Sequence, residues 1–132
     1  MIDSGIYALL IIADDCTMQI GSLGHIQFKR GYYLYVGSAQ KNMGSRIARH
    51  RRTNKKLRWH IDYFLKCGRI VDVFTTSLPK KCEEWISIQL SRSFDYVPKF
   101  GASDSHAPSH LFYGAKEDLS NELITLFERC RK

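Results

Sequence analysis

The sequence predicts a single α/β domain over residues 1–132, with a mixed sheet and helices around it. The chain has 132 residues, which is enough for one domain with a real hydrophobic core but too few for two. Hydrophobic residues make up 44% of the chain, so the composition is not that of a disordered protein. Apolar, β-rich segments alternate along the chain with segments of helical character, which is typical of an α/β order.

Six segments are predicted to be strands. The first is the apolar run that starts at Ile6, and it ends at the turn-forming pair Asp14-Asp15. Two short strands flank residues 21–24, where two glycines predict a hairpin turn. The predicted strands cover residues 6–13, 17–20, 25–29, 32–37, 70–76 and 110–113.

Four segments are predicted to be helices. We expect Ser45 to be the N-cap of the first helix and Gly68 to end the second. The third helix is expected to begin at either Ser77 or Pro79. The predicted helices cover approximately residues 45–52, 56–67, 77–92 and 118–130.

Positive charge is concentrated in one part of the chain. The net charge is +7, and residues 16–61 contain ten lysines and arginines but no aspartate or glutamate. Seven of these cations lie between Arg46 and Arg58. Such a segment attracts polyanions, of which nucleic-acid backbones are the commonest. The alternative is a solvated helix face that keeps the protein soluble, although ordinary surfaces intersperse the two signs.

The sequence shows no membrane-spanning segment and no export signal. The longest apolar run, residues 6–13, is too short for a transmembrane helix or a signal peptide. The four cysteines, at positions 16, 67, 82 and 130, lack the dense spacing of a disulfide-stapled secreted domain. We therefore expect a soluble, cytoplasmic protein with reduced thiols and no membrane association.

Two tripeptides and one helix carry side chains that suit a phosphodiester. Gly5-Ile6-Tyr7 and Tyr35-Val36-Gly37 each lie in a predicted strand, whereas Arg46 and His50 share one helix face. A tyrosine hydroxyl can orient water, and can deprotonate it if a nearby cation lowers the tyrosine pKa. An arginine can make a forked contact to phosphate. The alternatives are tyrosines that pack in a half-buried sheet and a solvated helix arginine.

In this order, the two tripeptides, the arginine-histidine pair and a later helix with acidic residues at its start resemble the GIY-YIG nuclease superfamily. Residues 59–63, 100–104 and 109–113 resemble a small stand-alone, single-domain branch of it. The resemblance implies an α+β fold with a small, mostly antiparallel, three-stranded central sheet flanked by helices. It also implies a metal-dependent endonuclease that cuts DNA and uses one divalent cation, Mg²⁺ or another such as Mn²⁺.

The resemblance assigns roles to individual residues. Tyr7 and Tyr35 match the motif tyrosines that position and activate water, and Arg46 matches the arginine that stabilises the phosphate. His50 matches a histidine one helical turn after that arginine. His60 matches a second histidine that some members place at the site, although it could also cap the core beside its tryptophan neighbour. The cations expected to contact nucleic acid are Arg49, Arg51, Arg52, Lys55, Lys56 and Arg58.

The metal-binding glutamate of the superfamily is expected early in the third predicted helix. Glu83 fits this position best. Glu84 is the competitor, because a shift of one residue turns a helical side chain by about 100°. A glutamate in the first turn also interacts favourably with the helix dipole, so either residue could have a purely structural reason to be there.

The sequence departs from the superfamily pattern in two places. There are 27 residues between Tyr7 and Tyr35, where about a dozen is usual, and the extra length predicts an inserted hairpin at residues 17–29. Residues 105–107 are Ser-His-Ala, in a loop where relatives of this branch often carry cysteines. His106 and His110 have a ligand-like spacing, but without a nearby cysteine pair they do not predict a zinc site.

The main hypothesis is a metal-dependent endonuclease acting on DNA. A non-catalytic nucleic-acid-binding module on the same fold is the alternative, and a domain whose basic face binds an acidic protein is a third hypothesis. Binding of nucleic acid would weaken steeply with salt under either of the first two, so only product formation separates them. The sequence leaves the substrate's structure and the oligomeric state open.

Overall fold

The computed structural model describes residues 3–103 and 105–131, and these form an α+β fold with one main sheet. The sheet has five antiparallel strands in the order β5-β1-β4-β7-β6, and a separate two-stranded hairpin is formed by β2 and β3. The strands are β1 (Gly5–Ala13), β2 (Cys16–Gln19), β3 (His25–Phe28), β4 (Gly31–Ala39), β5 (Gly68–Thr76), β6 (Asp95–Tyr96) and β7 (Leu111–Gly114). The helices are α1 (Met43–Arg51), α2 (His60–Phe64), α3 (Lys81–Ser93) and α4 (Lys116–Arg131), with the 3-10 turn η1 (Gly21–Leu23) in the hairpin.

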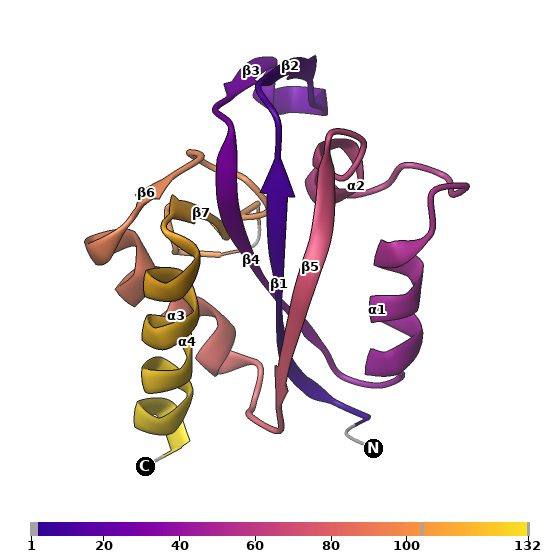
Figure 1. Cartoon of the computed structure of the whole chain (residues 1–132). Coiled ribbons are helices and arrows are strands. Elements are labelled where there is room, and N and C mark those ends of the chain that lie inside the picture. Colours follow the sequence, from indigo (N-terminus) through magenta and orange to yellow (C-terminus); the bar gives the residue numbers. More distant parts are fainter. Residues whose placement is uncertain (1–2, 104, 132) are drawn as a thin grey trace.

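Helices cover both faces of the sheet, with α1 and α2 on one face and α3 and α4 on the other (Figure 1). The central strand β1 is buried on both faces, because alternate side chains of a strand point in opposite directions. Ile6, Ala8 and Leu10 pack in the core beneath α3 and α4. Tyr7, Leu9 and Ile11 pack in the core on the α1 and α2 face. The two motif tyrosines therefore share the α1 face, since Tyr35 packs against this second core.

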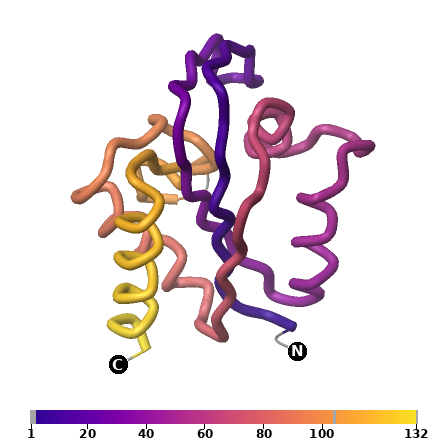
Figure 2. The backbone as a smooth tube through the Cα atoms, viewed as in Figure 1, coloured from indigo at the N-terminus to yellow at the C-terminus, as the bar shows by residue number. Residues whose placement is uncertain are grey.

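The hairpin predicted between the two motif strands is confirmed. It projects past the end of the main sheet as a separate unit (Figure 2), while β1 and β4 pair without interruption along their whole length. Phe28 of the hairpin packs against Phe64 of α2, with ring centroids 4.6 Å apart. The insertion lengthens the chain between Tyr7 and Tyr35 and leaves the register of the two motif strands intact.

The sheet differs in detail from its prediction. The antiparallel central sheet is confirmed, but β7 and β6 extend it to five strands, where the resemblance implied three. The expectation of a mixed sheet is wrong, because every described pairing is antiparallel. The two-residue strand β6 was not predicted, since it is too short to show a pattern.

Three helix predictions are corrected. The first helix begins at Met43, two residues before the predicted start, and the backbone amides of Asn42 and Met43 donate to Asp3 in place of a cap at Ser45. The second covers only His60–Phe64, where a helix from residue 56 was expected. Its start is set by Trp59, whose backbone is extended (φ −106°, ψ 159°), because the amides of the preceding segment bind a carboxylate described below. The third helix begins at Lys81, after the predicted start at Ser77 or Pro79.

The expectation of reduced thiols is contradicted by the structure, which pairs all four cysteines in disulfides. Cys16 is bonded to Cys67 and Cys82 to Cys130, across sequence separations of 51 and 48 residues. The first bond ties the hairpin to the end of α2, and the second ties the start of α3 to α4. Such distant pairs become neighbours only through the fold, so their spacing along the chain did not reveal them.

Removing the Cys82–Cys130 disulfide is expected to lower the free energy of unfolding by about 2–4 kcal/mol, because the cross-link closes a long loop in the unfolded chain. Denaturant unfolding of the Cys82→Ala/Cys130→Ala variant, with and without a reductant, measures the effect. The reductant should destabilise the wild-type protein far more than a control variant in which all four cysteines are replaced by alanine. A wild-type protein that is unaffected by the reductant would show that the cysteines are free thiols.

None of the helices formed by the described residues combines the length and the apolar content needed to cross a lipid bilayer. Asp104, part of one of the stretches that carried the resemblance, lies outside the described residues.

Candidate active site

A pocket of about 380 Å³ collects five of the six residues that were predicted to be catalytic or to bind the metal. It lies where β4 runs on past its pairing with β7, which ends at Tyr35. Side chains from β1, β4, α1, α2 and α3 and from the loop after β6 meet there. The pocket is lined by Tyr7, Tyr35, Gly37, Ser38, Arg46, Arg58, Trp59, His60, Glu83, Gly101 and Ser103. The structure thus brings Tyr7, Tyr35, Arg46, His60 and Glu83 together, as the sequence predicted.

The glycine of the second tripeptide provides the space for the tyrosine of the first. Tyr7 and Gly37 are direct partners in the β1–β4 pairing. A Cβ atom at Gly37 would lie 2.6 Å from Cζ and 2.7 Å from the hydroxyl oxygen of Tyr7. The Tyr7 ring therefore lies directly across the backbone of β4, and any larger residue at position 37 would displace its hydroxyl.

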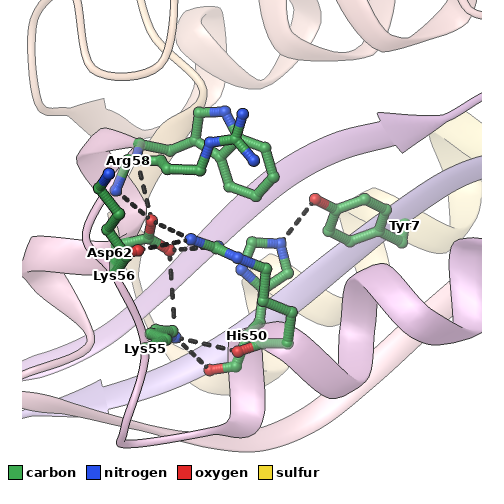
Figure 3. Close-up of polar contacts among 8 residues, drawn as sticks. Tyr7, His50, Lys55, Lys56, Arg58 and Asp62 are labelled. Atoms are coloured by element: carbon green, nitrogen blue, oxygen red, sulfur yellow. Dashed lines mark hydrogen bonds and ion pairs between the residues drawn. The ribbon is translucent and has the colours of Figure 1, made fainter.

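Tyr7 and His50 form a buried polar pair behind the pocket (Figure 3). The Tyr7 hydroxyl lies 2.8 Å from Nε2 of His50, and both residues are only 2% exposed. Burial raises the pKa of Tyr7 to about 12, although the nearby Arg46 guanidinium acts in the opposite direction. Burial lowers the pKa of His50 to about 4. Both groups are therefore neutral at neutral pH, and they share one hydrogen bond whose direction depends on the histidine tautomer.

His50 itself does not line the pocket, but it is hydrogen-bonded to Tyr7, which does. Its Nδ1 atom is buried and has no hydrogen-bond partner among the described residues. Its ring also contacts Tyr35 and Trp59, with centroids 6.2 and 5.9 Å away. His50 is therefore the residue that fixes the tyrosine rings from behind.

Tyr35 lines the pocket from β4, and its ring makes an edge contact with Phe100 at 6.3 Å between centroids. Burial raises the pKa of Tyr35 well above its usual value of 10, and the neighbouring Tyr7 and Glu83 act in the same direction. Tyr35 is thus also a neutral hydroxyl at neutral pH.

Arg46 is held over the pocket by two contacts. Its Nη1 atom donates to the carbonyl oxygen of Ser38 at 3.0 Å, and its guanidinium lies 5.0 Å from the centre of the Trp59 ring. A guanidinium has five N–H donors, so the hydrogen bond to Ser38 leaves others for an anion in the pocket. The cation is pre-positioned, as tight phosphate binding requires.

The structure separates the two candidate glutamates. Glu83 lines the pocket, where its Oε1 atom accepts a hydrogen bond from the Ser38 hydroxyl at 2.6 Å and its side chain remains 19% exposed. Glu84 accepts hydrogen bonds from the backbone amide of His106 and from the hydroxyl of Ser105, so it holds the loop after β6. Glu83 is the carboxylate that faces Tyr7, Tyr35 and Arg46.

His110 completes the surroundings of Glu83. Its Nδ1 atom lies 3.6 Å from Oε2 of Glu83 and 2.8 Å from the hydroxyl of Ser87. Burial lowers the pKa of His110, although Glu83 acts in the opposite direction, and the side chain is 2% exposed. A neutral His110 does not cancel the charge of the carboxylate, and at 3.6 Å it makes no hydrogen bond to it.

His60 reaches the pocket as a hydrogen-bond donor. Its Nδ1 atom accepts the backbone N–H of Gly101 at 2.8 Å, and burial lowers its pKa. A neutral ring that accepts at Nδ1 carries its proton on Nε2. His60 therefore presents an N–H group and, in this tautomer, is not a base. Its ring also packs on Phe100, so the core contact that the sequence left as an alternative is present as well.

Two of the predicted nucleic-acid-binding cations belong to a buried ionic network around Asp62 (Figure 3). Arg49 makes a forked contact to the Asp62 carboxylate, at 2.9 and 3.0 Å, and the Asp62 side chain is completely buried. Lys55 lies 4.0 Å from the same carboxylate, and its ammonium donates to the carbonyl oxygens of Arg49 and His50. These two cations hold the end of α1 in place, whereas Arg51, Arg52, Lys56 and Arg58 are exposed.

Asp62 also organises the segment before α2. Its Oδ2 atom accepts the backbone N–H groups of Arg58 at 2.8 Å and Trp59 at 3.0 Å. Burial acts to raise the pKa of Asp62, but the contacts with Arg49 and with these amides outweigh it and hold the pKa below the usual 3.8. The ionised carboxylate thereby fixes the Trp59 ring, which lies against the guanidiniums of Arg46, Arg49 and Arg58.

Sequence reasoning missed Ser38, His110 and Asp62 as members or supports of the site. Ser38 contributes through a hydroxyl and a carbonyl, which no pattern in the chain distinguishes. Asp62 did carry a signal, since it is the first acidic residue after the long cationic segment. An acidic residue next to so many cations is a natural partner for one of them.

The residues of the pocket fit a single hard divalent cation. Among the described residues, no three His, Cys, Asp or Glu side chains cluster so as to enclose a metal ion. Mg²⁺ does not require such a cage, because it keeps several waters and is commonly bound by one or two carboxylates together with substrate phosphates. Glu83 is a partly exposed carboxylate with hydroxyl oxygen nearby, which is the oxygen-rich donor set that this ion prefers.

An antiparallel α+β domain with tyrosine, arginine and glutamate side chains around one pocket is the class of protein that the fold and the site define. Residues 6–132 match the sequence profile described as the domain of unknown function DUF123, and the chain belongs to that family. No curated protein and no solved structure matches the chain.

Proposed function

We propose that this protein is a metal-dependent endonuclease of the GIY-YIG type that hydrolyses phosphodiester bonds in DNA. One observation carries the proposal: Tyr7, Tyr35, Arg46 and Glu83, which come from four different elements, line a single pocket. A packing role alone would not require a tyrosine hydroxyl, a guanidinium and a carboxylate to converge. The tyrosine hydroxyls could bind a water molecule, the guanidinium a phosphate and the carboxylate a cation.

In the proposed reaction, Arg46 binds the non-bridging oxygens of the scissile phosphate. Its remaining N–H donors are available, and its position is fixed by Ser38 and Trp59 before the substrate arrives. Such pre-organised donors stabilise the extra negative charge of the pentavalent transition state without reorganisation. His60, which also lines the pocket, adds an N–H donor.

Tyr7 and Tyr35 position the attacking water. Both hydroxyls are neutral in the protein alone, because burial raises their pKa values. The hydrogen bond to His50 fixes the Tyr7 hydroxyl, and it offers a path for a proton to move between the tyrosine and the imidazole. In this proposal the tyrosine hydroxyls orient the water. Tyr7 would accept the proton of the water only as a phenolate, after its own proton had passed to Nε2 of His50, and a bound cation would favour the phenolate by lowering the pKa of Tyr7.

Glu83 is the residue that would hold the divalent cation, proposed to be Mg²⁺ or a similar ion such as Mn²⁺. When bound, such an ion neutralises charge on the leaving oxygen and polarises the phosphate. The hydroxyl of Ser38 holds the Glu83 carboxylate in position through its hydrogen bond.

The proposal is tested by incubating the protein with single-stranded, duplex and branched DNA, with Mg²⁺ and with EDTA in its place. Magnesium-dependent cleavage is expected, and Tyr35→Phe should reduce it by about 10²-fold or more while DNA binding is retained. Tyr32→Phe, on the same strand but outside the pocket, is the matched control. Equal cleavage rates for Tyr35→Phe and the wild-type protein would refute the assignment.

A nucleic-acid-binding module without catalysis is the second candidate. The observation that favours it is the state of Tyr7, Tyr35 and His50, whose burial shifts each pKa away from neutrality. Under this alternative the same DNA molecules would be bound but would remain uncut at every Mg²⁺ concentration.

A further inference from the structure

The candidate active site opens into a longer cationic track. Two further hollows adjoin it, with volumes of about 460 and 710 Å³. The pocket and the first hollow share Arg58, and the first and second hollows share Arg52, Asn54 and Lys55. The three hollows therefore lie side by side, in a row that leads from Glu83 to the edge strand β5.

The far end of this track, which we call the outer groove, is lined by four exposed cations: Arg51, Arg52, Lys66 and Arg69. Arg51 and Arg52 come from the end of α1 and the loop that follows it, which extends outward from the sheet (Figure 2). Lys66 follows α2 directly, and Arg69 lies on β5. Lys66 and Arg69 are outside the cationic segment that the sequence singled out, so only the fold brings them to this groove.

The positive charge of the outer groove is not compensated within the described part of the chain. None of its four exposed cations makes an ion pair or a side-chain hydrogen bond with residues 3–103 or 105–131. Among the described residues, Asp62 is the only acidic one that lines the groove, and its side chain is completely buried and bound to Arg49. An ordinary protein surface mixes the two signs, so four uncompensated cations in one hollow point to an anionic partner.

The shape of the track selects the kind of anion. A compact anion needs one enclosed site, whereas these cations are spread along a row of neighbouring hollows that begins at the candidate active site. A nucleic-acid strand carries a phosphate at every nucleotide and therefore matches a row of cations that leads away from one reacting phosphate. The apolar side chains of Leu57, Leu65 and Ile70 also line the groove.

We propose that the outer groove binds backbone phosphates of the same DNA strand whose scissile phosphate lies in the pocket with Glu83, several nucleotides away from it. This inference rests on the proposed function and deepens it, because it fixes the side on which the substrate continues. The DNA strand crosses the loop between α1 and α2 and reaches β5 at Arg69. Recognition is of the backbone, so it carries no base preference.

The test compares the affinities for two DNA strands, one just long enough to fill the pocket and one several times longer. Fluorescence anisotropy is measured with the Glu83→Gln protein, so that the DNA is not cut. The long strand should bind more tightly, and Lys66→Gln/Arg69→Gln should remove most of that advantage. The slope of log K against log salt for the long strand should become shallower by about one for each phosphate that the variant no longer neutralises.

The matched control is Lys116→Gln/Arg129→Gln, which removes the same charge from exposed positions on α4, across the sheet. It should keep the ratio of the two affinities. The proposed role of the outer groove would be refuted if Lys66→Gln/Arg69→Gln left the ratio of the two affinities unchanged, or if the α4 control lowered that ratio equally. Neither result would refute the proposed function. Failure of the Glu83→Gln and wild-type proteins to bind any DNA would instead overturn both.

Discussion

Replacing Glu83 with glutamine is expected to abolish Mg²⁺-dependent cleavage of DNA while leaving DNA binding intact. Glutamine has nearly the same shape and can still accept a hydrogen bond from Ser38, so the fold around the pocket should be preserved. What disappears is the negative charge that would hold the divalent cation. Removing one group that stabilises the transition state typically costs about 10²–10³-fold in kcat, and loss of the metal should cost at least as much.

The adjacent Glu84 provides the matched control for Glu83. It lies one residue further along the same helix turn, but it binds the loop at Ser105 and His106. Glu84→Gln should therefore cut DNA at close to the wild-type rate. Loss of cleavage in Glu84→Gln but not in Glu83→Gln would move the metal ligand to the neighbouring residue, and full cleavage by both would refute the proposed mechanism.

Asp62→Asn is expected to lower the free energy of unfolding by about 3–5 kcal/mol, the largest loss of stability among the variants described. Breaking a buried ion pair leaves the remaining charges buried without a partner. The Asp62 carboxylate is completely buried and accepts hydrogen bonds from Arg49 and from two backbone amides. Removing the charge leaves the cations of Arg49 and Lys55 without their partner. Denaturant unfolding against Asp72→Asn, an exposed aspartate on β5, measures the difference.

The effect of Asp62→Asn should also depend on pH. The contacts of the folded protein hold the pKa of Asp62 below its usual value of 3.8, so the ionised group stabilises the fold at any pH well above that value. As the pH falls below about 4 and through the lower pKa of the folded state, this contribution disappears. The difference in the free energy of unfolding between the wild-type and variant proteins should therefore be largest at neutral pH and become smaller in acid. A difference that is independent of pH would mean that the carboxylate's charge does not stabilise the fold.

The strands could be predicted where local pattern decides the structure. The apolar run of β1 and the β-rich segments of β4 and β5 appear at nearly the predicted positions, because a buried strand must be apolar wherever it lies. The short second helix could not be predicted. Residues 56–59 have a helical composition, but the amides of Arg58 and Trp59 bind the side chain of Asp62, four and three residues further on, and the helix begins only at His60.

The candidate site could be predicted in part. The tripeptides and Arg46 were found because their order along the chain is distinctive, and the structure gathers them in one pocket. The choice between Glu83 and Glu84 could not be made, because it depends on which way α3 is rotated against the sheet. The roles of Arg49 and Lys55 could not be separated from those of the exposed cations either, because burial is a property of the fold.

Because Tyr7 and Gly37 are in contact, a change in one of the two tripeptides constrains which residues the other can contain. The tyrosine ring occupies the space that a side chain at position 37 would need. A Gly37→Ala change could be accommodated by a smaller residue at position 7, but such a residue would carry no hydroxyl to the pocket. Second-site mutations that restore the stability of Gly37→Ala should therefore include smaller residues at position 7. Second-site mutations that restore its cleavage activity should not, because a smaller residue at position 7 lacks the tyrosine hydroxyl.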